Sequence, residues 1–290
     1  CYSQKWRNFI SHNWECCSRN NGLHFPAHID KNRYHRETAS FLLLLLASRV
    51  VYYPFFPMND YLARSRNLPK SFLFILPLLV FYEVGIILYG SETKNAADVI
   101  IKKPFEIFGN HATLVFNSLI IIVSFCSIFY IEKKNRLSCG IFIPMFLESA
   151  AYAFSLGYVI LFFVHGYLPF NITDLHVQGF INGIITSLGA GIYEEILFRL
   201  LLLSILYLVI VKVLKLNAII GSFLSILICA CIFSIMHYIG MAGDSFSMSS
   251  FLFRAVAGFI LSAIFIFRGL GIAVYTHAIY DILIIHKAYS

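Results

Sequence analysis

The sequence predicts an all-α fold, a polytopic bundle of transmembrane helices, and three observations predict it. The 290 residues are 59% hydrophobic and only 13% charged, too few polar residues to cover a soluble domain of this size. Apolar runs of about 20 residues, the length that crosses a bilayer, recur from residue 71 to the end. Because lipid cannot satisfy backbone N–H and C=O groups, such runs must be helical.

Residues 1–57 differ from the rest of the chain. Their one apolar block, residues 41–51, is about half the length of a spanning helix. Met58 is the first methionine, and a short basic leader separates it from the first long apolar run. We expect one membrane-embedded domain at residues 58–290. Residues 1–57 are expected to be a disordered N-terminal arm, or upstream sequence that is not native to the protein.

The apolar runs predict about seven spanning helices, at residues 71–89, 112–131, 141–164, 191–211, 218–238, 248–267 and 271–285. Residues 180–188 lead directly into Gly189 and Gly191. One unbroken helix over residues 180–211 would be about 48 Å long, more than the bilayer core accepts without steep tilt. The glycine pair therefore predicts a break, with residues 180–188 forming a short interfacial or re-entrant helix.

The charges predict lipid contact and orientation. The net charge of +7 comes from 22 basic and 15 acidic residues, with no concentrated basic run, so we expect a lipid bilayer and no nucleic acid as partner. If Met58 is cytoplasmic, nine loop cations face the cytoplasm, namely Arg64, Arg66, Lys70, Lys133, Lys134, Arg136, Lys212, Lys215 and Arg268. Four lie opposite, namely Lys94, Lys102, Lys103 and Lys287. This bias predicts a multi-pass cell-membrane protein with cytoplasmic Met58.

Catalytic or binding residues are expected among the ionisable groups inside the membrane spans, where a charge costs free energy. Each ionisable group in a span costs a few kcal/mol at the bilayer centre, and such groups indicate function more often than structure. They are Glu83, Glu148, Glu194, Glu195, Arg199, His237, Arg254, His277 and Asp281. For Glu83 and Glu148 we expect structural roles, either lining the back of a polar pocket or pairing with Arg254.

The densest group is Glu194, Glu195 and Arg199. Glu195 and Arg199 are four residues apart, so a helix places them on one face as an ion pair. Glu194 lies about 100° away around the helix and lacks that partner. A buried carboxylate without a cation suits a general base, although both glutamates could also simply favour the start of a helix.

Two later segments supply histidines. His237 ends one apolar run, and His277 and Asp281 lie four residues apart on one face of the last. Two glutamates, two histidines and an aspartate from three helices can converge in one polar pocket of an otherwise apolar bundle.

The ordered series Glu194-Glu195-x-x-x-Arg199, Phe233-x-x-x-His237 and His277-x-x-x-Asp281 resembles the CPBP family, in its bacterial form. This family contains the CAAX prenyl proteases and bacteriocin-processing enzymes, also called the Abi family of intramembrane glutamate endopeptidases. Each motif alone is weak, but the ordered set at membrane spacing is specific.

The resemblance implies hydrolysis of a peptide bond in a membrane-associated protein or peptide substrate. It implies that Glu194 and His237 activate water and that His277 and Asp281 stabilise the oxyanion. Glu195 and Arg199 would hold the helix face around Glu194. Members of the family often have asparagine where this chain has Asp281. Asp281 must therefore be protonated, orient His277, or bind a metal, because an ionised carboxylate donates no hydrogen bond.

Three alternatives stay open. Glu194, His237, His277 and Asp281 would make an acceptable zinc site, although the chain has no HExxH helix. We expect the metal-free mechanism, with no cofactor. The same polar cluster could instead serve a transporter, or a non-catalytic membrane partner of another protein.

Overall fold

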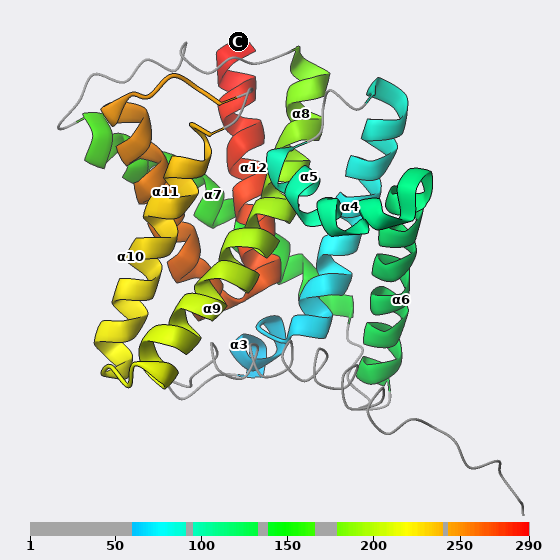
Figure 1. The fold of residues 1–290 in the computed structure, drawn as a ribbon, viewed down its shortest axis with the longest axis horizontal. Coiled ribbons are helices and arrows are strands. Elements are labelled where there is room, and N and C mark those ends of the chain that lie inside the picture. The colour runs from blue at the N-terminus through cyan, green and yellow to red at the C-terminus, as the bar shows by residue number, and fades with distance from the viewer. Residues whose placement is uncertain (1–59, 91–94, 133–138, 166–178, 240–242, 290) are drawn as a thin grey trace, which may run out of the picture. The chain divides into compact units, whose positions relative to one another are not determined.

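The computed structural model describes residues 60–90, 95–132, 139–165, 179–239 and 243–289. The predictions for residues 1–57 lie outside these ranges. Within them the chain is helical and contains no strand (Figure 1). The elements are α3 (Asp60–Ser65), α4 (Leu68–Tyr89), α5 (Ala96–Lys102), η2 (Lys103–His111), α6 (Ala112–Glu132), η3 (Cys139–Ile141), α7 (Phe142–His165), α8 (Phe180–Gly189), η5 (Ala190–Leu203), α9 (Ser204–Tyr207), η6 (Leu208–Val213), α10 (Ala218–Met236), α11 (Met248–Arg268) and α12 (Leu270–Tyr289).

The helices make this a multi-pass membrane protein. Among the described residues, 6 helices are long and apolar enough to cross a membrane. They are Leu68–Tyr89, Ala112–Phe129, Phe142–Ile160, Phe180–Val213, Ala218–Met236 and Met248–Arg268. The seventh predicted span corresponds to a shorter apolar helix, Leu270–His286. The all-α, polytopic fold predicted from the apolar runs is therefore confirmed.

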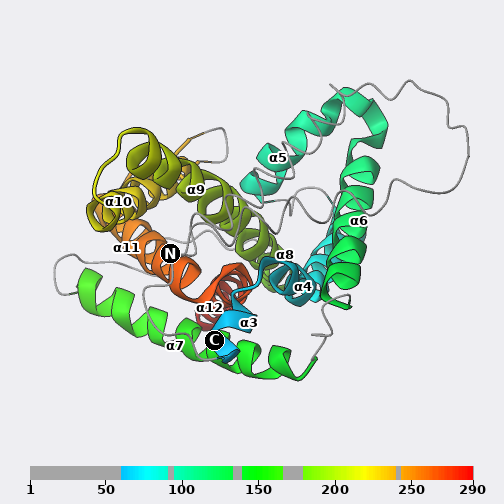
Figure 2. The same cartoon turned by 90° about the horizontal axis from the view of Figure 1, so that it is seen from below.

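Helix α12 is the central element of this bundle. It packs against α4, α7, α8, η5 and α11, which surround it in the view of Figure 2. Gly269 connects α11 to α12 and is the C-cap of α11. Its φ is 91°, and its backbone N–H donates a hydrogen bond of 2.9 Å to the Phe265 carbonyl oxygen. Since the first two turns of α12 are apolar and buried, the polar residues further along this helix are held inside the protein.

The predicted break at Gly189 and Gly191 is wrong. Residues Phe180–Val213 form one helical run of 34 residues, so residues 180–188 are no separate interfacial or re-entrant helix. Gly189 has ordinary helical angles, and the chain continues from it into the π-helical η5. The glycines serve close packing instead. A Cβ at Gly189 would lie 2.4 Å from Tyr82 Cε2, and one at Gly191 would lie 2.7 Å from Ala278 Cβ.

We expect Gly191→Ala to destabilise the bundle by about 1–3 kcal/mol, because the new Cβ would overpack the contact with α12. It would lie 2.9 Å from both the Ala278 nitrogen and the Val274 oxygen, which are backbone atoms that cannot rotate away. Gly157→Ala is the matched control, since its nearest neighbour is the Tyr280 ring at 3.7 Å. Thermal unfolding in detergent compares the two variants, and equal midpoints would contradict the prediction.

Candidate active site

The predicted pair of Glu195 and Arg199 forms on η5. Glu195 Oε1 lies 2.9 Å from Arg199 Nη1, and neither side chain is exposed. The Arg199 guanidinium lies over the Phe233 ring of α10, 4.4 Å from its centroid. This stacking gives the buried cation a second favourable contact. The i,i+4 prediction is confirmed, and the pair joins η5 to α10.

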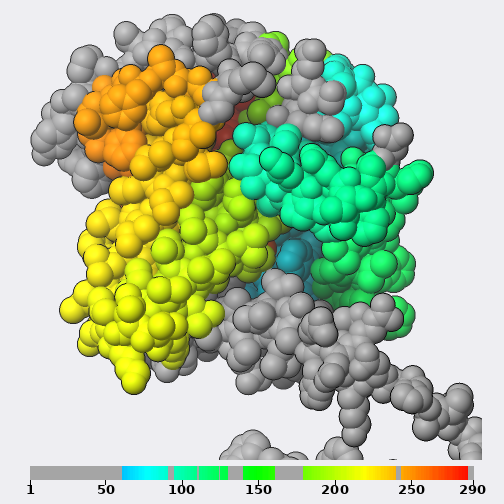
Figure 3. All heavy atoms as spheres, in the orientation of Figure 1, coloured from blue at the N-terminus to red at the C-terminus, as the bar shows by residue number. Residues whose placement is uncertain are grey.

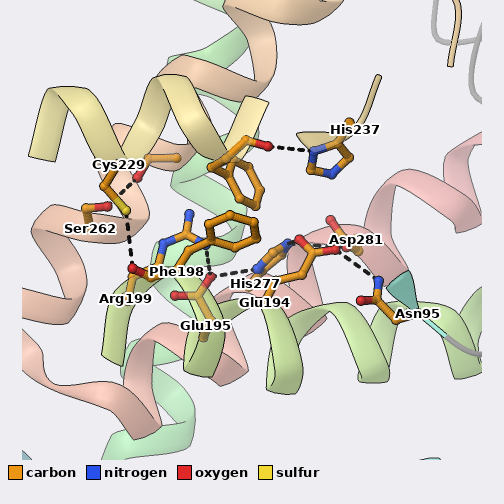
Figure 4. A network of polar contacts seen from close by, with 12 residues as sticks. Asn95, Glu194, Glu195, Phe198, Arg199, Cys229, His237, Ser262, His277 and Asp281 are labelled. Carbon is orange, nitrogen blue, oxygen red and sulfur yellow. Dashed lines mark hydrogen bonds and ion pairs between the residues drawn. The ribbon is translucent and has the colours of Figure 1, made fainter. Parts of the chain in front are cut away.

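His277 of α12 is held by the same glutamate. Its Nδ1 lies 2.7 Å from Glu195 Oε1 (Figure 4). An ionised carboxylate only accepts, so Nδ1 carries the proton and donates it. The opposite nitrogen, Nε2, lies 3.9 Å from Glu194 Oε2 and 3.5 Å from Asp281 Oδ2. His277 and Asp281 therefore share one helix face as predicted, and Nε2 is directed between two carboxylates.

Glu194 has different partners from Glu195. Its side chain is buried, with 7% of the residue exposed, and its Oε1 accepts a hydrogen bond of 2.9 Å from Asn95 Nδ2. Its Oε2 faces His277. Glu194 therefore has an amide and an imidazole as polar neighbours, whereas Glu195 has a guanidinium and an imidazole. The two neighbouring carboxylates are set apart by these surroundings, as the sequence predicts.

His237 follows directly after the membrane-spanning part of α10 and caps that helix. Its Nδ1 lies 2.9 Å from the Phe233 carbonyl oxygen, which can only accept, so Nδ1 is the protonated nitrogen. Burial lowers the pKa of His237 below its ordinary value, which favours the neutral ring. Nε2 therefore keeps a lone pair. Figure 4 shows this ring on the side of the Glu194 and Asp281 carboxylates.

Phe233 lies between the two histidines. Its ring centroid is 4.9 Å from that of His237 and 6.2 Å from that of His277.

The space-filling view is hollowed between α5 and the adjoining ends of α10 and α11, with atoms of α12 visible inside (Figure 3). The helix that carries His277 and Asp281 is therefore visible from this face of the molecule.

The remaining predicted charges have other partners. Glu83 pairs with Lys102 Nζ at 2.9 Å, and Glu148 pairs with Arg268. Arg254 pairs with Asp244, just before α11, so the suggested pairing of Glu83 or Glu148 with Arg254 is wrong. The physical reason is position: Glu148 and Arg268 meet near α3, whose Tyr61 donates to Glu148, whereas Arg254 lies in the first half of α11.

Asn95 is a site residue that the sequence pattern does not reveal. It precedes α5, caps that helix, and contacts a glutamate 99 positions later in the chain. Its place before a short helix signals a cap, but nothing local in the sequence signals the distant contact.

The chemistry available here is acid–base chemistry on water. A buried carboxylate, an imidazole whose burial favours the neutral ring, and a second imidazole aimed between two carboxylates face one region of the bundle. Across the part of the chain that the structure describes, no group of three or more His, Cys, Asp or Glu residues could hold a metal ion. The alternative zinc ligands Glu194, His237, His277 and Asp281 are thus near one another without forming such a group.

The match to a known protein family covers the same part of the chain as the candidate active site. Residues 176–283 match the family model described as type II CAAX prenyl endopeptidase Rce1-like. The matched segment contains Glu194, His237, His277 and Asp281, and Asn95 lies outside it. Neither a curated protein nor a solved structure matches the chain. Residues 176–283 are thus similar to a family of CAAX prenyl endopeptidases, and the described part of the chain contains six helices that are apolar and long enough to cross a membrane.

Proposed function

We propose that this protein hydrolyses a peptide bond in a membrane-associated protein or peptide, with Glu194 as general base. The observation that carries the proposal is the buried Glu194 carboxylate, which faces His277 Nε2 across 3.9 Å inside the family-matched segment. That separation is longer than a hydrogen bond, so the carboxylate oxygen remains available to a water molecule.

In the proposed reaction, Glu194 and the lone pair of His237 Nε2 orient a water molecule, and Glu194 accepts its proton. The water oxygen attacks the scissile carbonyl carbon and gives a tetrahedral oxyanion. The carbon–nitrogen bond then breaks, and the proton held by Glu194 passes to the leaving amine. The products are an amine and a carboxylic acid, which then releases its proton to solvent, and Glu194 is restored.

His277 is the proposed donor to the oxyanion. With Nδ1–H given to Glu195, a second proton on Nε2 makes an imidazolium that can donate to developing negative charge. Asp281, with Oδ2 at 3.5 Å from Nε2, would balance that charge and orient the ring. This role requires no proton on Asp281. The Glu195–Arg199 pair would fix the His277 ring from its Nδ1 side.

A cleavage assay in proteoliposomes tests the function. The reporter is an internally quenched peptide with a farnesylated CAAX terminus, chosen because the matched family is described as CAAX prenyl endopeptidases. We expect His237→Ala and His277→Ala each to lower kcat by about a hundredfold or more, because each removes a group that acts in the transition state. His111→Ala, at an exposed position on η2, is the matched control. Parental activity in both variants would overturn the assignment.

We further propose a cell-membrane location with the Met58 side cytoplasmic, supported by the bias of loop cations described above. The His237 end of α10 would then face the opposite side. Labelling of Ser245→Cys and Lys215→Cys in intact cells by an impermeant thiol reagent, with native cysteines replaced, tests this. Labelling at position 245 and protection at 215 is expected, and the reverse pattern would contradict the orientation.

A further inference from the structure

We propose that Asn95 is a positioning residue that fixes the orientation of the Glu194 carboxylate for catalysis. This inference rests on the proposed role of Glu194 as general base. It concerns a residue outside the family-matched segment, on an element that contains none of the predicted site residues.

The amide of Asn95 can point only one way. Its Oδ1 accepts a hydrogen bond of 2.8 Å from the backbone N–H of Ala97, as the N-cap of α5. A backbone N–H can only donate, so the oxygen must stay on that side of the amide. The Nδ2 group is thereby turned toward Glu194 Oε1, at 2.9 Å. Capping of α5 and donation to Glu194 are therefore coupled in one rigid group.

This bond determines what the other oxygen of Glu194 can do. With Oε1 held by Asn95, Oε2 stays 3.9 Å from His277 Nε2. A carboxylate freed from Asn95 could rotate and pair directly with His277, since opposite charges attract strongly in an apolar interior. Such a pair would occupy both the proposed base and the proposed oxyanion donor. Asn95 keeps the two groups apart.

The start of α5 is held by tyrosine. The Asn95 backbone N–H donates to Tyr82 Oη at 3.3 Å, and that hydroxyl donates to Asp98 Oδ2 at 2.9 Å. Tyr82 comes from α4 and is fully buried. Its ring also packs edge-on against Tyr193, with centroids 5.4 Å apart. The first turn of α5 is thus fixed to a spanning helix.

The end of α5 is held by a lysine between two carboxylates. Lys102 Nζ lies 2.7 Å from Asp98 Oδ1 and 2.9 Å from Glu83 Oε1. Glu83 Oε1 also accepts a hydrogen bond of 2.9 Å from the hydroxyl of Tyr193, the residue before Glu194. The same buried cluster therefore fixes α5 and the backbone next to the base. Both partners of the Asn95–Glu194 bond are positioned by it.

Two substitutions remove the donor and keep the cap. Ser and Asp cap helices about as well as Asn, but neither carries an amide that reaches Glu194. We expect Asn95→Ser and Asn95→Asp to lower kcat on the farnesylated reporter by about tenfold to a hundredfold, the effect of losing a hydrogen bond to a charged group. KM should stay at the parental value. The larger loss is expected for Asn95→Asp, which places a second carboxylate beside Glu194.

Asn217 provides the matched control, because it caps α10 from an exposed position and its Oδ1 accepts from the Ile219 N–H at 2.9 Å. Asn217→Ser and Asn217→Asp should leave kcat unchanged. Parental kcat in both Asn95 variants, with Glu194→Gln inactive, would overturn the positioning role and leave the proposed function intact. A lowered unfolding midpoint with unchanged kcat per folded enzyme would also overturn it, since Asn95 would then be only a cap. An active Glu194→Gln enzyme would instead overturn the proposed function.

Discussion

Glu194→Gln is expected to lower kcat for the farnesylated reporter by about a hundredfold to ten-thousandfold, the usual contribution of a general base. Glutamine has nearly the same shape, and its amide oxygen can still accept the hydrogen bond from Asn95 Nδ2. It cannot take a proton from water. The fold should therefore survive while the chemical step is lost.

Three measurements separate this effect from misfolding. The unfolding midpoint and the elution volume in detergent should equal those of the parent. Glu106→Gln, which removes an exposed carboxylate from η2, should keep parental kcat. If Glu194→Gln retains a tenth or more of the parental kcat, Glu194 is not the base and the proposed mechanism fails.

Arg199→Leu is expected to destabilise the protein by about 3–5 kcal/mol, the cost of breaking a buried ion pair from one side. Both Arg199 and Glu195 have 0% exposed side chains, so the remaining carboxylate would be buried without its cation. The guanidinium contact with the Phe233 ring would be lost as well. Reversible unfolding in mixed micelles measures the change in free energy of unfolding.

Arg254→Leu is the matched control for that measurement. Its partner Asp244 has a 49% exposed side chain, so water can replace the lost contact and the cost should stay below about 1 kcal/mol. The double variant Arg199→Leu, Glu195→Gln should recover part of the loss, because it leaves no unpaired charge. Equal costs for Arg199→Leu and Arg254→Leu would contradict the account of the buried pair.

The fold was predictable to the extent that it depends on length and hydropathy. Six of the seven predicted spans follow from apolar runs of bilayer length, and their predicted and observed ends differ by a few residues, whereas the span predicted at residues 191–211 begins at Phe180. The continuous helix through Gly189 and Gly191 was not predictable in this way. The reason these positions are glycine lies in Tyr82 and Ala278, which approach from other helices. A sequence shows a missing side chain, but it does not show the neighbour that requires its absence.

The contacts of the candidate site also divide into those that the sequence predicts and those that it does not. Two contacts within single helices, Glu195 with Arg199 and His277 with Asp281, follow from helical periodicity alone. Contacts between helices do not. The bond of Asn95 to Glu194 spans 99 positions, and neither local pattern nor hydropathy relates the two residues.

The most direct test of the central claim, that Glu194 and His237 activate water at a metal-free centre, is cleavage by the purified, reconstituted enzyme after exhaustive chelation. Product masses identify the new termini of the farnesylated reporter before and after treatment. We expect one peptide bond to be cut at an unchanged rate, and Glu194→Gln to cut it at least about a hundredfold more slowly under either condition. Loss of cleavage on chelation, with recovery on added zinc, would contradict the account.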